Sequence, residues 1–198
     1  MVAMLAQSLL ALSLIVRVYD AFGVPADHLD LARVTVDRIL KDAGVTVAWR
    51  PCPCPTPLDA GELVVRIIAA SSSSEPASLG FSSVDLRRKS GTLATVFADR
   101  VHALAAGADI DDDGQLLGRV IAHELTHLLV GTREHERHGL MRGQWTTRDL
   151  AKQQPSDWIL SGTQRTEIRQ AIARRSIEAT RPAIVTADAN PASDVSAQ

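Results

Sequence analysis

The chain has 198 residues, the usual size of one domain and enough to bury a hydrophobic core. Hydrophobic residues make up 45% of it, which excludes a disordered chain on composition. The formal net charge is -2 and Arg87-Arg88-Lys89 is only a short basic run, so we expect no nucleic-acid partner.

The beginning of the chain is apolar, and Arg17 is its first charged residue. The uncharged stretch is too short and too polar to predict a stable membrane span. We interpret residues 1–11 as a truncated secretory leader that runs into the first strand, although the positive start of a leader is missing. This interpretation places the protein outside the cytoplasm, either secreted or periplasmic.

Hydrophobic periodicity predicts a β-α-β-β-β-α order along residues 12–130. The first strand covers residues 12–19. A helix follows over 27–42, with Asp27 as its N-cap and Gly44 as its end. The remaining elements are three strands over 45–49, 63–69 and 92–98, and a long helix over 113–130. The order favours an α/β sheet in which strand 63–69 is of the buried parallel kind.

Beyond the long helix, residues 165–175 have helical composition and are expected to pack back on the domain. The last residues are rich in Ala, Thr, Asp, Ser and Pro. We therefore predict one catalytic domain over residues 12–178 and a flexible tail over 179–198.

Cys52 and Cys54 lie in the proline-rich segment 51–57. Two cysteines do not build a disulfide framework, and their spacing is not that of a paired CxxC zinc site. A bridge between residues so close in sequence would be strained. We therefore expect structural or unpaired thiols here.

The strongest chemical signal is the sequence His123-Glu124-Leu125-Thr126-His127 within the long apolar helix. Residues four apart lie one turn apart on the same helix face, so both imidazoles can bind one ion at roughly 2.0–2.1 Å. Glu124 points to the flank of that face, where it can accept a proton from a metal-activated water without binding the metal. Two histidines on so apolar a helix would be poorly satisfied without an ion, which favours a zinc site over a chance match.

Zinc hydrolases use a third protein ligand and keep a fourth position open. Gly131 can adopt the left-handed conformation that ends a helix and turns the chain back. The segment after it returns toward the metal and carries His135, which we take as the third ligand. His138 is its main competitor, and Glu134 and Glu136 are weaker ones.

The segment 123–135, followed by Gly139-Leu140-Met141, resembles the signature of metzincin zinc peptidases, which is HExxHxxGxxH with a later methionine turn. The resemblance implies the following roles: His123, His127 and His135 as zinc ligands, Glu124 as general base, and Met141 as the turn methionine. It also implies a mixed sheet with an antiparallel edge strand, a backing helix and a long active-site helix. In that family the edge strand pairs with an extended peptide substrate, and residues 92–98 are our candidate for it.

The spacing departs from the family pattern. Gly131 follows His127 by four residues instead of three, and His135 follows it by eight instead of six. No tyrosine follows Met141, so the tyrosine ligand of some metzincin branches is absent. By resemblance the site is most similar to matrixin-like members.

The acidic segment Asp109–Gly114 resembles the first half of a calcium-binding EF-hand loop. The twelfth position of such a loop should be a bidentate Glu, and here it is Val120. We interpret the segment instead as an acidic start of the long helix, with Asp113 as its N-cap.

The sequence therefore predicts a zinc-dependent peptidase that acts on peptide or protein substrates, with Glu124 as the catalytic base. Two alternatives stay open at this point. One is a zinc-binding module without catalytic activity, which the presence of Glu124 disfavours. The other is a zinc hydrolase of another clan, with a distant carboxylate such as Glu167 as third ligand.

Overall fold

The computed structural model describes residues 12–71, 75, 77–108, 113–152 and 154–180. The predicted leader over residues 1–11, most of the predicted tail and residues 109–112 of the acidic segment lie outside the described residues. None of the described helices is long and apolar enough to cross a membrane.

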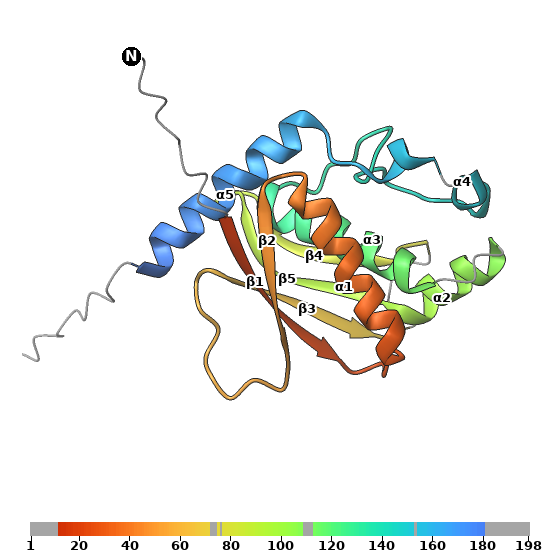
Figure 1. Cartoon of the computed structure of the whole chain (residues 1–198), viewed down its shortest axis with the longest axis horizontal. Helices are drawn as coiled ribbons and strands as arrows, with labels where there is room; N and C mark the ends of the chain where they lie inside the picture. The colour runs from red at the N-terminus through yellow and green to blue at the C-terminus, as the bar shows by residue number, and fades with distance from the viewer. Residues whose placement is uncertain (1–11, 72–74, 76, 109–112, 153, 181–198) are drawn as a thin grey trace, which may run out of the picture.

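A five-stranded mixed sheet forms the centre of the molecule, in the order β2-β1-β3-β5-β4 (Figure 1). Its strands are β1 (Leu12–Asp20), β2 (Val45–Pro51), β3 (Glu62–Ile68), β4 (Gly80–Asp85) and β5 (Ser90–Phe97). The pairs β1–β2, β1–β3 and β3–β5 are parallel, and β4 pairs antiparallel with β5. The α/β class, the mixed sheet and its single antiparallel pair are as predicted.

The helices are α1 (Ala26–Lys41), α2 (Ala98–Gly107), α3 (Asp113–Val130), α4 (Thr147–Lys152) and α5 (Gly162–Thr180). A 3-10 turn, η1 (Pro155–Trp158), lies between α4 and α5. Helices α1 and α3 pack on each other beside the sheet, and α3 also contacts α5 (Figure 1). The predicted long helix 113–130 is confirmed. Helix α1 begins at Ala26 after Pro25, so Asp27 lies in its first turn and is not its N-cap.

The identity of the edge strand is a correction. Residues 92–98 were expected to form it, but β5 lies inside the sheet between β3 and β4. The edge strand is β4, which periodicity did not predict because Gly80-Phe81-Ser82-Ser83-Val84-Asp85 has only two apolar residues. Helix α2, which follows β5 directly, was also not predicted.

Two glycines set the distance between α1 and α3. A Cβ atom added at Gly114 would lie 2.7 Å from the carbonyl oxygen of His28, and one at Gly118 would lie 2.5 Å from that of Ala32. Only glycine permits so close an approach of the two backbones. The N-terminal half of α3 is thereby fixed against α1.

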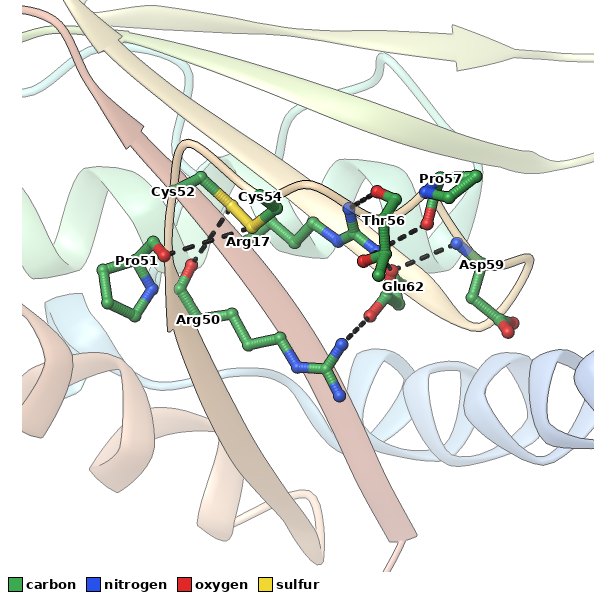
Figure 2. Close-up of a disulfide and its surroundings, with 9 residues drawn as sticks. All are labelled: Arg17, Arg50, Pro51, Cys52, Cys54, Thr56, Pro57, Asp59 and Glu62. Atoms are coloured by element: carbon green, nitrogen blue, oxygen red, sulfur yellow. Dashed lines mark hydrogen bonds and ion pairs between the residues drawn. A yellow bond between two sulfur atoms is a disulfide. The ribbon is translucent and has the colours of Figure 1, made fainter.

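The two cysteines are the second correction. Cys52 and Cys54 form a disulfide in the β2–β3 loop (Figure 2), so the expectation of unpaired thiols is wrong. Their Cα atoms lie 4.6 Å apart, within the range that a disulfide spans. An extended chain would hold two residues at this spacing about 7 Å apart, so the chain bends tightly at Pro53, which the sequence spacing alone did not reveal.

Beside the disulfide, the same loop covers a buried ion pair between Arg17 and Glu62 (Figure 2). Arg17 also donates to the carbonyl oxygens of Thr56 and Pro57, both at 2.7 Å. Burial pushes the pKa of Glu62 upward. The backbone N–H of Asp59 and the cations of Arg17 and Arg50 outweigh it, and the pKa lies below its ordinary value.

We expect Glu62→Gln to destabilise the fold by about 3–5 kcal/mol, because it leaves the buried Arg17 without a counter-charge. Arg50→Gln is the matched control, since its side chain is 52% exposed and its pair with Glu62 should contribute at most about 1 kcal/mol. Urea denaturation of both variants at neutral pH measures the difference.

The carboxylate of Glu62 should also make the stability of the fold depend on pH in the acid range. Because the folded pKa of Glu62 is depressed, its contribution is complete above the ordinary value of 4.5 and disappears as the pH falls through the folded value. The difference in the free energy of unfolding between wild type and Glu62→Gln should therefore become smaller as the pH falls below 4.5. Equal stability of the Glu62 and Arg50 variants at neutral pH would contradict this account.

Candidate metal centre

Helix α3 supplies two histidines that face each other one turn apart. His123 and His127 are 7% and 5% exposed, and their Nε2 atoms lie 3.0 Å apart. The spacing follows from the helix itself, since residues i and i+4 lie on one face. The apolar residues of α3 pack into the core and so fix the helix face that carries the two histidines.

The chain turns back after α3 and brings in a third imidazole. Gly131 has a φ of 75°, the left-handed conformation predicted for it, and its N–H donates to the carbonyl of His127 at 2.9 Å. Four residues later, the Nε2 atom of His135 lies 3.3 Å from that of His127. The three ligand atoms of His123, His127 and His135 all lie within 4.8 Å of one another.

Gly131→Ala should disturb this turn strongly. The φ of 75° is unfavourable for alanine, and its Cβ atom would collide with the backbone of Lys89 in the β4–β5 turn. Gly23→Ala is the matched control, because Gly23 has a φ of 82° but open space around it. We expect a loss of about 1–2 kcal/mol for Gly23→Ala and a clearly larger one for Gly131→Ala in thermal or urea unfolding. Equal losses would show that the contact with Lys89 does not matter.

The outer nitrogen atoms of two rings are held by backbone carbonyls. The Nδ1 atom of His123 lies 2.8 Å from the carbonyl oxygen of Leu140, and that of His127 lies 2.8 Å from that of Thr132. A carbonyl only accepts, so both Nδ1 atoms carry the proton and both Nε2 atoms carry a lone pair. The lone pairs point at one another, an arrangement that a shared cation relieves.

The pKa values of the three histidines are lowered, which agrees with neutral imidazole rings. Burial lowers the pKa of His123 to about 3, and His127 adds to this while the Leu140 hydrogen bond opposes it. Burial and the neighbouring His135 lower the pKa of His127 to about 4. Burial also lowers the pKa of His135. Neutral imidazole is the form that binds metal ions.

Glu124 lies beside the three histidines without joining them. Its side chain is 5% exposed, and the hydroxyl of Ser82 lies 2.7 Å from its Oε2 atom. Burial raises the pKa of Glu124 to about 7, and the Ser82 hydrogen bond works in the opposite direction. Gly80 leaves room for the carboxylate, since a Cβ atom there would lie 3.2 Å from Oε1. Strand β4 therefore packs directly against this acid.

These residues line an open cleft of about 1180 Å³. Residues 79–85, which include the whole edge strand β4, form one wall, and residues 142–146 line another part. Trp145 is half-buried there and meets the ring of His123 edge-on, with centroids 5.6 Å apart. The lining of the cleft thus runs along the whole of β4.

Comparisons with known proteins found a likeness of fold. No protein-family model and no curated protein matches the chain. Among solved structures, the chain is similar to an archaemetzincin from Methanopyrus kandleri, with a TM-score of 0.54 and 13% sequence identity. The match covers 86% of this chain and 100% of that one. At this identity the likeness shows the shared fold alone.

The competing ligand candidates lie apart from the three histidines. His138 and Glu134 are exposed, and neither belongs to the three-histidine group found among the described residues. Glu136 accepts a hydrogen bond from Gln164 at 2.9 Å. Glu167 is exposed on α5 and is also outside the group.

The structure adds residues that the sequence did not indicate. The predicted turn residue Met141 is 2% exposed, as a core residue would be. Three groups that contact the site were not predicted: Ser82, Trp145 and the carbonyl of Leu140. Ser82 could not be found from its spacing, because its strand was not recognised. A carbonyl contact leaves no trace in residue type, since every residue carries one.

Proposed function

We propose that this chain is a zinc-dependent metallopeptidase with His123, His127 and His135 as metal ligands and Glu124 as general base. The observation that carries the proposal is the convergence of three imidazoles, whose ligand nitrogens lie within 4.8 Å of one another, beside a buried carboxylate and an open cleft. The fold likeness to an archaemetzincin supports a peptidase of the metzincin type.

The donor set fits zinc. Three neutral imidazoles are the ligands of well-known catalytic zinc sites, and the backbone carbonyls of Leu140 and Thr132 supply the outer hydrogen bonds that such ligands usually have. Zinc bound there would polarise the substrate carbonyl and lower the pKa of a water molecule to about 7.

Glu124 has the position of a proton acceptor. It is next to a ligand in sequence but turns its carboxylate toward Ser82 and the cleft. We propose that it takes a proton from the attacking water and passes it to the leaving amine. The Ser82 hydroxyl holds Oε2 and leaves the other oxygen for this transfer.

We propose that the substrate is an extended peptide that pairs with the outer edge of β4. The edge strand lines the cleft and lies beside Glu124. Addition of a strand to a free sheet edge uses main-chain hydrogen bonds, so it would place a peptide bond near the metal with little dependence on side chains.

The two alternatives are less well supported. A zinc module without activity does not explain the buried carboxylate of Glu124 beside an open cleft. A distant third ligand such as Glu167 is not needed, because His135 already lies 3.3 Å from His127.

The test is a peptide-library digest by purified protein before and after chelation. We expect cleavage that disappears with a chelator and returns when Zn²⁺ is added, because the metal is part of the machinery. His123→Ala should lose one equivalent of zinc relative to wild type, together with activity. Cleavage that survives chelation, or unchanged zinc in His123→Ala, would refute the proposal.

A location outside the cytoplasm also stays a proposal. The Cys52–Cys54 disulfide supports it, since disulfides persist mainly in oxidising compartments.

A further inference from the structure

Two indole rings lie between helix α3 and the part of the chain that follows the metal centre. Trp145 lines the cleft and meets the ring of His123 edge-on, with centroids 5.6 Å apart. Trp158, in η1, meets Trp145 edge-on in turn, with centroids 5.2 Å apart. Both distances are within the range of about 4.5–7 Å over which aromatic pairs attract each other. The three rings therefore form one continuous row that ends on a proposed zinc ligand.

The far end of this row returns to α3. The guanidinium carbon of Arg119 lies 3.9 Å from the centroid of the Trp158 ring, which is a cation–π contact. Arg119 precedes His123 by four residues, so the two side chains leave the same face of α3 one turn apart. One face of the helix thus contacts both indoles, one through a guanidinium and the other through an imidazole.

Ring contacts, and not hydrogen bonds, set the orientation of the two indoles. Among the described residues, neither Nε1 of Trp145 nor Nε1 of Trp158 has a hydrogen-bond partner, although both atoms are buried. Trp158 is 7% exposed and belongs to the core, while Trp145 is half-buried and packs against the core. The core therefore holds Trp158, and Trp158 holds Trp145 against His123.

The segment that carries Trp145 is also attached at its other end. The Nη1 atom of Arg142 lies 3.4 Å from Oδ1 of Asp149 in α4. One residue later, the backbone at Gly143 passes close to the third proposed ligand, since a Cβ atom there would lie 3.2 Å from Cγ of His135. Residues 142–145 are thus fixed at both ends and contact two of the three imidazoles.

We propose that Trp145 is a positioning residue for the metal centre, which holds the ring of His123 in the orientation that binds zinc and is itself supported by Trp158. This inference rests on the proposed function, since it takes His123 as a ligand. The Nδ1 atom of His123 is held by the carbonyl of Leu140. A single hydrogen bond fixes one atom and lets the ring tilt about it. The edge-on indole blocks this tilt, so both contacts together orient the ligand nitrogen.

The experiment measures the Zn²⁺ affinity of the full chain by competition with a chromophoric chelator, after bound metal has been removed. We expect Trp145→Ala to bind zinc about 10–100-fold more weakly than wild type, the usual effect of removing an outer partner of a metal ligand. Trp145→Phe keeps a ring in the contact and should stay within about twofold of wild type. Trp158→Leu removes the supporting ring but keeps an apolar core residue. It should bind about 2–10-fold more weakly, although Trp158 belongs to no ligand group.

Trp49→Phe is the matched control. It also removes one indole, but from β2, which lies at the opposite edge of the sheet from β4, and it should bind zinc like wild type. Circular dichroism and thermal unfolding of the metal-free variants separate a lost fold from a lost orientation. A purely structural role of Trp145 would lower the stability of the metal-free protein and leave its zinc affinity unchanged.

Wild-type zinc affinity in Trp145→Ala or in Trp158→Leu would overturn the inference. Equal losses in Trp145→Ala and Trp145→Phe would also overturn it, because phenylalanine keeps a ring against His123. Failure of the proposed function appears differently, as unchanged zinc in His123→Ala. Loss of zinc from His123→Ala together with wild-type affinity in Trp145→Ala would refute the positioning role alone.

Discussion

Replacement of Glu124 by glutamine should reduce peptide turnover by about 10²–10⁴-fold, the usual range for loss of a general base. The zinc content should stay at the wild-type level, because the carboxylate lies beside the three imidazoles and is not part of the group. Glutamine can keep the hydrogen bond from Ser82, which lies 2.7 Å from Oε2, so the side chain should stay in place. The measurements are kcat on a cleaved peptide and zinc per chain in the same preparation.

Glu134→Gln is the matched control, since Glu134 is an exposed carboxylate in the loop between Gly131 and His135. It should leave both kcat and zinc unchanged. Loss of zinc from Glu124→Gln would mean that Glu124 is a ligand. Full activity in that variant would mean that another group accepts the proton.

Replacement of His135 by alanine should remove one equivalent of zinc and all zinc-dependent cleavage, because it leaves two of the proposed ligands on α3 and none on the return loop. His138→Ala provides the direct comparison. It removes the same chemical group three residues later in the chain, from an exposed position outside the three-histidine group. Zinc content and circular dichroism at matched pH distinguish a lost ligand from a lost fold.

The opposite result would be informative. If His138→Ala emptied the site and His135→Ala did not, the return loop would have to adopt another path after Gly131. The proposed ligand set would then be wrong, while a zinc hydrolase built on His123 and His127 could still stand.

The long helix and its histidine pair were predictable because the signal is local. Periodicity placed α3 at residues 113–130, and the i, i+4 spacing of His123 and His127 follows from helix geometry. Gly131 was predictable for the same reason, since a glycine after an apolar helix favours a left-handed turn. His135 followed from the direction of that turn.

The remainder of the site depends on contacts between distant segments. Ser82 reaches Glu124 across 42 positions of sequence, and its strand is too polar to be recognised by periodicity. The Cys52–Cys54 bridge depends on the loop path around Pro53. Which strand occupies the edge depends on the order β2-β1-β3-β5-β4, a property of pairing that no single strand's composition encodes.

The contact of Gly131 with Lys89 has a practical consequence for protein engineering. The turn at Arg87–Lys89 is short, exposed and charged, which would ordinarily recommend it for an epitope tag or an inserted domain. Here its backbone abuts the glycine that starts the return loop toward His135. An insertion there would shift the loop that carries a proposed ligand, so tags and fusion partners should be placed elsewhere.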